Sequence, residues 1–208
     1  MIEFLWAGGP VMVPIGVASV VGLTAFLERL WSLRQSAVLP ATFEVELLEL
    51  ARQERWADAM TLCRKQPVAA ARICEGALAD RGRDRALIRE RLEDVGRREA
   101  ADLERFIPVL GTVASIAPLL GLLGTVGGMI LTFQVIEQQG VQDVSDLAGG
   151  ISQALVTTFA GLSVGIPALV GNRYLLSRVD RLLLDLEELS TALLEIMAPG
   201  ADEGENSA

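Results

Sequence analysis

Three long stretches of the chain carry no charged residue: Phe4–Leu27, Phe106–Ile136 and Leu147–Asn172. Surface helices of a soluble domain keep one polar face, so a soluble fold gives no reason for uncharged stretches of this length. Each stretch also exceeds the roughly 20 residues that a helix needs to cross a bilayer core of about 30 Å. The pattern therefore predicts an all-α, polytopic membrane protein. Its three transmembrane helices are expected over residues 11–33, 106–136 and 147–172.

The polar segment between the first two runs also follows helical patterns. Residues 34–105 predict a cytoplasmic helical domain with breaks at Gln66–Pro67 and near Gly82. We see no strong break between the charged helix that starts at Asp84 and the second apolar run. A single helix is therefore expected from about residue 84 to about residue 134.

A heptad pattern follows the third apolar run and predicts a cytoplasmic helix over residues 173–198. Its apolar positions are Leu175, Val179, Leu182, Leu186, Leu189 and Leu193. This heptad seam is expected to pack either against the 84–105 helix of the same chain or against another copy. Either way, two of the membrane helices extend into a cytoplasmic helical bundle.

The basic residues are confined to two blocks, which orient the chain. All 18 Lys and Arg lie between Arg29 and Arg105 or between Arg173 and Arg181. Because cytoplasmic segments of membrane proteins carry the excess of Lys and Arg, we predict an N-terminus outside and a C-terminus inside. Residues 1–10 then form an external N-terminus, and residues 137–146 form a periplasmic loop.

The first apolar run lacks the basic n-region and the cleavage site of a signal peptide, so we expect it to remain as a transmembrane helix. The net charge of −9 does not come from the cytoplasmic segment up to Arg105, whose acids and bases balance. No nucleic-acid partner is implied. Residues 199–208 predict a disordered acidic tail.

Residues for catalysis or metal binding are scarce. The chain has no histidine, and its two cysteines, Cys63 and Cys74, do not form a CxxC motif. A zinc site or a catalytic thiol would need such partners. We interpret the cysteines as small, reduced helix residues and expect neither an enzyme nor a cofactor or bound metal.

The second and third apolar runs are rich in small residues, which allow helix backbones to approach closely in lipid. We therefore assign tight helix packing to a set of six glycines: Gly121, Gly124, Gly128, Gly150, Gly161 and Gly165.

Polar residues in the same runs have two interpretations. Gln153 and Thr157 lie one helical turn apart with Thr158 beside them, and such groups avoid lipid. They face either another helix or a wet pathway. No carboxylate, lysine or histidine lies within a crossing, so any proton carrier would have to come from a partner.

Two motifs resemble the MotA/TolQ/ExbB proton channel family, in its ExbB and TolQ branch. They are APLLGLLGTVGGMILTF in the second run and GGISQALVTTFAGLSVGIPALVGNRY in the third. The cytoplasmic pieces LCRKQPVAAARICEGAL and RREAADLERF are similar to that branch as well. The resemblance covers nearly the whole chain.

The resemblance implies a subunit of an ion-driven motor, powered by the proton-motive force, in the bacterial inner membrane. Five copies would surround ExbD- or TolR-like single-span helices, each with a membrane aspartate, and would energise envelope processes such as TonB-dependent transport. The translocated ion would be H⁺. Na⁺ stays open, because amide and hydroxyl oxygens suit a hard cation.

Carried over by residue, Thr125 and Thr158 match the family's pore-facing threonines, and Gln153 stands where the family has a glutamate. Glutamine cannot ionise. We assign the ion pathway to Thr125, Gln153, Thr157 and Thr158. The alternatives are a non-conducting scaffold subunit, or a motor that drives surface motility or Tol-type envelope maintenance.

Overall fold

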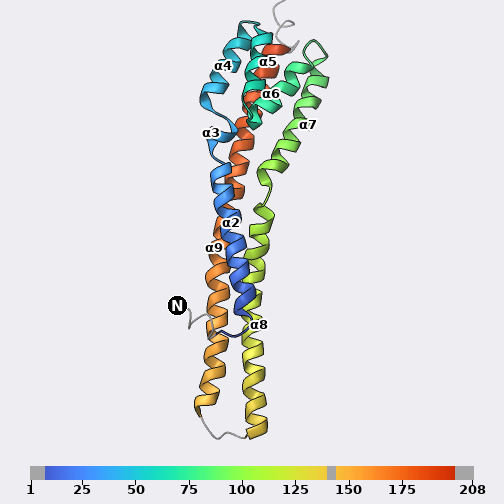
Figure 1. Cartoon of the computed structure of the whole chain (residues 1–208). Helices are drawn as coiled ribbons and strands as arrows, with labels where there is room; N and C mark the ends of the chain where they lie inside the picture. Colours follow the sequence, from blue (N-terminus) through green and yellow to red (C-terminus); the bar gives the residue numbers. More distant parts are fainter. Residues whose placement is uncertain (1–7, 140–143, 200–208) are drawn as a thin grey trace, which may run out of the picture. The chain divides into compact units, whose positions relative to one another are not determined.

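The computed structural model describes residues 8–139 and 144–199, which are helical apart from short turns and loops (Figure 1). The helices are α2 (Met12–Ser32), α3 (Gln35–Val38), α4 (Ala41–Arg52), α5 (Trp56–Lys65), α6 (Ala69–Ala79), α7 (Arg85–Glu104), α8 (Ile107–Gln139) and α9 (Val144–Met197). Three helical stretches are long and apolar enough to cross a membrane, within α2, the α7–α8 segment and α9. The prediction of an all-α protein with three such helices is confirmed.

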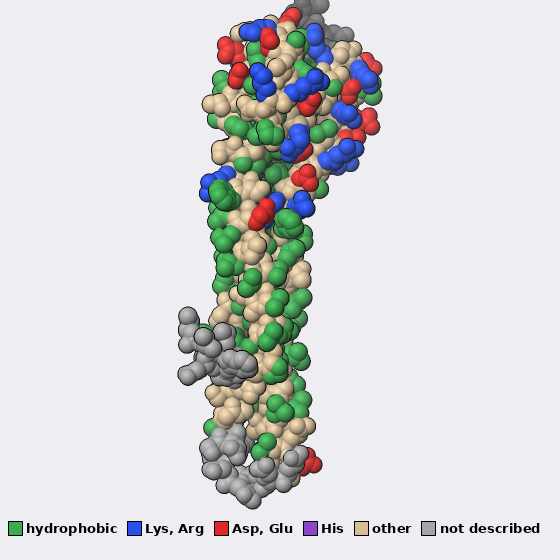
Figure 2. Space-filling view, in the orientation of Figure 1, with side chains coloured by type: hydrophobic (Ala, Val, Ile, Leu, Met, Phe, Trp, Pro, Cys, Tyr) green, Lys and Arg blue, Asp and Glu red, His purple; other side chains and the backbone are tan. Residues whose placement is uncertain are grey.

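The chain divides into two compact units. The first contains Met1–Arg29 and Phe106–Leu175, and the second contains Leu30–Arg105 and Leu176–Ala208. Helices α2 and α9 contribute to both units. Charged side chains cover the helices of the second unit, whereas apolar side chains dominate the visible surface of α2, α8 and the first part of α9 (Figure 2).

In the first unit, α8 and α9 form an antiparallel pair. Gly111, near the start of α8, lies against Asn172, and Thr132, near its end, lies against Gly150. The side chain of Asn172 donates a hydrogen bond of 3.0 Å to the carbonyl oxygen of Ile107. Helix α2 packs beside this pair: a carbon added at Gly22 would lie 3.0 Å from Val113 Cγ1. Small residues thus permit close contact at both interfaces.

The expected helix over residues 84–134 is interrupted. Helix α7 ends at Glu104 and α8 begins at Ile107, and Phe106 between them has a φ of 66°. The reason is Pro108, which has no N–H to donate to the carbonyl of Glu104 and whose ring would clash with that carbonyl in a continuous helix. The prediction of one continuous helix over residues 84–134 is therefore wrong at Pro108. The third apolar run and the segment after it do form one helix, α9.

The second unit has a core of aliphatic and alanine side chains. All six residues of the heptad seam are buried within the single chain, five of them in this unit and Leu175 at the end of the first, so the seam packs inside this chain and not against another copy. Side-chain hydrogen bonds add to the core. Arg178 on α9 donates from Nε to the carbonyl of Leu33, 2.6 Å away, and Arg72 on α6 forms a two-point ion pair with the buried Glu99 on α7.

Candidate functional site

All six glycines assigned to helix packing lie against the opposing helix of the α8–α9 pair. A carbon added at Gly161 would stand 2.5 Å from the carbonyl oxygen of Ala117 and 2.9 Å from the Cα of Gly121. Both are backbone atoms and cannot turn away, so the two backbones touch where only glycine fits. One at Gly165 would lie 2.6 Å from Cγ of Pro118, so glycine makes room for the proline ring there.

The remaining glycines continue the same contact toward the far end of the pair. A carbon added at Gly128 would stand 3.1 Å from Ala154 Cβ, and one added at Gly124 would stand 2.2 Å from Thr157 Cγ2. One added at Gly121 would stand 3.1 Å from Thr158 Cα. The hydroxyl of the buried Thr132 lies against Gly150. Its Oγ1 donates a hydrogen bond of 2.9 Å to the carbonyl of Gly128 in the same helix. Because the Thr132 side chain is buried against Gly150, Thr132 is part of the packing between α8 and α9.

Thr158 of α9 lies at this contact, and Thr125 of α8 follows Gly121 by one helical turn. The hydroxyl of Thr158 donates to the carbonyl oxygen of Gly121 across the helix pair, at 3.1 Å. Thr125 is one turn further along α8 and donates within its own helix to the carbonyl of Leu122, at 2.7 Å. Both side chains are half-buried. A hydroxyl has one proton and two lone pairs, so each oxygen can still accept a hydrogen bond or bind a cation.

Thr157 and Gln153 belong to a different surface. Thr157 is fully buried, and its Oγ1 lies 2.8 Å from the carbonyl oxygens of both Gly8 and Gln153. The amide of Gln153 lies against Gly9, where an added carbon would stand 2.1 Å from Nε2. These two residues therefore contact the segment that leads into α2.

The four pathway candidates therefore do not form one site: Gln153 and Thr157 contact the Gly8–Gly9 turn, whereas Thr125 and Thr158 do not. Successive residues of a helix point about 100° apart, so Thr157 and Thr158 cannot face the same way. The sequence-based prediction did not include the Gly8–Gly9 turn, which covers Thr157. The Gly-Gly-Pro sequence at residues 8–10 was the available signal, because such tripeptides mark turns.

Ionisable groups lie at the end of the first unit. Arg29 of α2 is buried, donates to Glu28 at 2.7 Å and lies 5.4 Å from the ring centre of Phe106. Within the described parts of α8 and α9 that carry Thr125 and Thr158, from Ile107 to Ile136 and from Ala148 to Asn172, no acidic or basic residue occurs.

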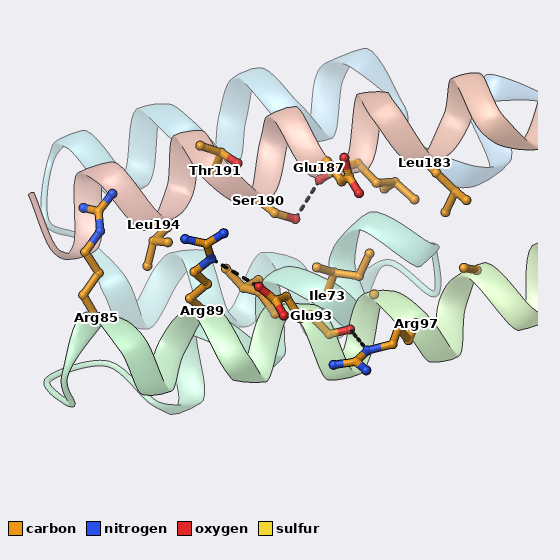
Figure 3. Close-up of a pocket in the computed structure, with 14 residues that line it drawn as sticks. Ile73, Arg85, Arg89, Glu93, Arg97, Leu183, Glu187, Ser190, Thr191 and Leu194 are labelled. Atoms are coloured by element: carbon orange, nitrogen blue, oxygen red, sulfur yellow. Dashed lines mark hydrogen bonds and ion pairs between the residues drawn. The ribbon is translucent and has the colours of Figure 1, made fainter. Parts of the chain in front are cut away.

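The second unit contains a groove of about 660 Å³ between α7 and the last part of α9 (Figure 3). Its arginine side chains already have partners in the protein. Arg89 pairs with Glu93 at 3.2 Å, and Arg85 donates to the carbonyl of Ala198 beside the last turn of α9. A cation there compensates the helix dipole. These contacts give the arginines structural roles.

The two cysteines also lie in the second unit, on α5 and α6, and both are free and buried. Burial raises the pKa of the Cys63 thiol to about 12 and raises the pKa of Cys74 as well. Thiols become nucleophiles and metal ligands as thiolates, so both remain unreactive near neutral pH. Among the described residues, no group of three or more Cys, Asp or Glu side chains is placed to hold a metal ion.

Comparison with known proteins gives a family match. The model of the MotA/TolQ/ExbB proton channel family matches residues 64–188. The putative biopolymer transport protein ExbB-like 1 of Synechocystis is 32% identical over 183 residues, which are 84% of this chain and 70% of that protein.

Two shorter matches name both members of the branch. The biopolymer transport protein ExbB of Aquifex aeolicus is 39% identical over 88 residues, which are 42% of this chain and 60% of that protein. The Tol-Pal system protein TolQ of Haemophilus influenzae is 36% identical over 100 residues, which are 46% of this chain and 44% of that protein. The aligned part is less than two thirds of either relative.

Proposed function

The chain belongs to the MotA/TolQ/ExbB proton channel family, a family of membrane proteins and not of enzymes, and we propose that it is a subunit of an ion-driven motor in a bacterial inner membrane. In this proposal five copies form a channel wall around ExbD- or TolR-like single-span helices. Each of these partner helices contributes a membrane aspartate. The complex energises an envelope process such as TonB-dependent transport.

The observation that carries this proposal is the half-exposed pair of hydroxyls at Thr125 and Thr158. Each donates its proton to a backbone carbonyl, at 2.7 Å and 3.1 Å, and so presents oxygen lone pairs outward. Polar oxygens in a membrane span face a partner or water rather than lipid. Together they make an acceptor surface that fits the O–H of a protonated carboxyl group.

A partner carboxyl group completes the chemistry that this chain lacks. A protonated aspartic acid can donate a hydrogen bond to either threonine oxygen, whereas its ionised form can only accept and must draw a hydroxyl proton away from a backbone carbonyl. The wall therefore favours the protonated carboxyl, and release of the proton favours movement of the aspartate away from it. H⁺ is the proposed ion, with no cofactor. Na⁺ remains the competing ion, because hydroxyl oxygens also bind hard cations.

The proposed orientation has the N-terminus outside and the C-terminus inside. The cytoplasmic end of α2 then carries Trp31, which is 70% exposed, and Arg34, whose guanidinium lies 5.4 Å from the Trp31 ring centre. Tryptophan is enriched at membrane interfaces and arginine on the cytoplasmic side, so this pair supports the assignment.

Replacing Thr158 with valine tests the proposal. Valine keeps the shape of threonine and removes the oxygen, so Thr158→Val in proteoliposomes with the partner subunit should lower ion flux at least tenfold. Thr24→Val is the matched control, because Thr24 also donates within its helix, to Val20 at 2.8 Å, but lies on α2. Native mass spectrometry should show the same complex for both variants. Unchanged flux in Thr158→Val would contradict the pathway assignment.

One observation favours a second candidate, a non-conducting scaffold. Gln153 stands where the family has an ionisable residue. Native mass spectrometry of the complex from its own membrane separates the two functions. Five copies with two small single-span chains support the motor, and a homo-oligomer without such a chain supports the scaffold. Growth and motility phenotypes of a deletion strain then distinguish TonB-dependent uptake, Tol-type envelope maintenance and surface motility.

A further inference from the structure

The surface of α9 around Thr157 is closed by a turn from the beginning of the chain. Thr157 is fully buried although its side chain is polar, and its hydroxyl oxygen lies 2.8 Å from the carbonyl oxygen of Gly8. Its methyl group fills the space at Gly124 of α8, where an added carbon would stand 2.2 Å from Thr157 Cγ2. Thr157 is therefore held between α8 and the Gly8–Gly9 turn.

The two glycines let the turn fit this surface without displacing the side chains of Met12 and Gln153. Gly9 has a φ of 71°, which favours glycine, and an added carbon there would lie 2.1 Å from Gln153 Nε2. At Gly8, an added carbon would lie 2.5 Å from Cγ of Met12. The carbonyl of Gly9 then accepts a hydrogen bond of 3.1 Å from the Met12 amide, which links the turn to the first residue of α2.

The Thr158 side of the contact between α8 and α9 points in another direction, because successive helix residues are about 100° apart. Thr157 is buried under the Gly8–Gly9 turn, whereas Thr158 is half-exposed beside Gly121. Gln153 is also half-exposed, and its uncharged amide lies against Gly9. A carboxylate in its place would lose part of its hydration there without a cation to pair with it.

We propose that Gln153 and Thr157 are positioning residues that bind the Gly8–Gly9 turn, and that the bound turn closes this side of α9 to ions. The pathway of this subunit then runs only along the Thr125–Thr158 side. The binding of the turn stands on its own contacts. The effect on ions rests on the proposed function, and the tests below separate the two.

The first test is a disulfide between the turn and α9. An added carbon at Gly9 would lie 3.8 Å from Gln153 Cγ, the atom whose place a cysteine sulfur takes. In a chain with Cys63→Ala and Cys74→Ala, the pair Gly9→Cys with Gln153→Cys should cross-link within one chain under mild oxidation. The control pair, Gly9→Cys with Thr158→Cys, also carries Gln153→Ala to free the same space at Gly9, and it should not cross-link. Cross-linking of the control pair at an equal rate would overturn the proposal.

The second test leaves the turn unchanged. Thr157→Val keeps the methyl group that packs on α8 but removes the hydroxyl, whereas Thr157→Ser keeps the hydroxyl and removes the methyl group. In nanodiscs, hydrogen exchange at the Met12 amide should become at least tenfold faster in Thr157→Val and stay within twofold of wild type in Thr157→Ser. Equal exchange in the two variants would show that the hydroxyl does not hold the turn.

Ion flux measured in the same variants, with the partner subunit bound and in its absence, tests the functional part. Thr157→Val should leak ions without the partner, and Thr157→Ser should not. Faster exchange without a leak would overturn the closure of α9 and leave the binding of the turn intact. Absence of flux in the wild-type complex under all conditions would instead refute the motor function, while the cross-linking result would stand.

Discussion

Helix α9 passes through both units of the protein and packs by two different means. In the first unit its contact residues are small: Gly150, Ala154, Gly161 and Gly165 touch α8 directly. In the second unit the contact residues are leucines at heptad spacing, from Leu182 to Leu193, and they are buried. One helix therefore shows both modes within its 54 residues.

The difference follows from the medium around each unit. Water drives leucine side chains together, because burying them removes apolar surface from water. Lipid is as apolar as leucine and gives no such drive, so association depends on close van der Waals contact between small residues. Enlarging a contact residue should therefore lower stability most in the first unit. Truncating a contact residue should lower stability most in the second.

The largest effect is expected from enlarging the contact in the first unit. Gly161→Leu would place its side chain against the Ala117 carbonyl and the backbone of Gly121 and should prevent recovery of a folded protein. Even Gly161→Ala should cost about 3 kcal/mol or more. Thermal unfolding in mild detergent measures the loss. Gly149→Ala is the control, because an added carbon there meets nothing within 4 Å. Equal stability of the two alanine variants would refute the close contact.

A truncation in the second unit should have the next largest effect. Leu186 is 2% exposed, and Leu186→Ala should lower the free energy of unfolding by about 2–5 kcal/mol through lost burial and a cavity. Leu184, which is 62% exposed on the same helix, provides the control, and Leu184→Ala should change stability by less than about 0.5 kcal/mol. If both variants unfolded at the same temperature, the heptad seam would not be a core.

The ion pair between α6 and α7 should contribute less. Glu99 is buried and accepts from Arg72 at 2.6 Å, and this hydrogen bond raises the pKa of Arg72. Because the Arg72 side chain is half-exposed, Glu99→Gln should cost about 2 kcal/mol rather than the full cost of a broken buried pair. Glu75→Gln breaks an exposed pair with Arg64 and should cost less than about 0.5 kcal/mol. A ratio near one between these losses would contradict the burial of Glu99.

The smallest effect concerns the buried thiol of Cys63. Its pKa of about 12 in the folded protein lies above the ordinary value of 9.0, so the folded state holds the proton more tightly than the unfolded state. The buried, protonated thiol stabilises the folded state fully below pH 9, and this stabilisation is lost as the pH rises toward 12. Neither Cys63→Ala nor Cys63→Ser carries this thiol, so both variants should lose less stability than wild type as the pH rises from 9 toward 12. An alkaline midpoint identical to that of wild type would show that the thiol does not ionise on unfolding.

The sequence alone was sufficient for the membrane spans and the family. A charge in lipid is costly at every position of a span, so three long runs without charged residues are enough to identify the spans. The glycines on α8 and α9 were likewise assigned to packing from their spacing. The orientation and the segment boundaries stay predictions, and the acidic tail lies outside the described residues except for Pro199.

Local backbone geometry was harder to predict. The break before α8 depended on Pro108, yet Pro118 and Pro167 lie inside α8 and α9 without ending them. A proline is tolerated where neighbouring helices accommodate its ring, as Gly165 does for Pro118. Whether such a neighbour exists is not a property of the proline's own segment.

The partition of the polar residues was decided by the tertiary structure. Helical geometry requires Thr157 and Thr158 to point in different directions, but the sequence did not say which of them meets a partner within the chain. That depended on how α8, α9 and the Gly8–Gly9 turn fit together, since a hydroxyl is satisfied by whichever carbonyl lies within about 3 Å. The length and polarity of each helix follow from the local sequence. Which polar side chains stay accessible is decided only when the helices pack against one another.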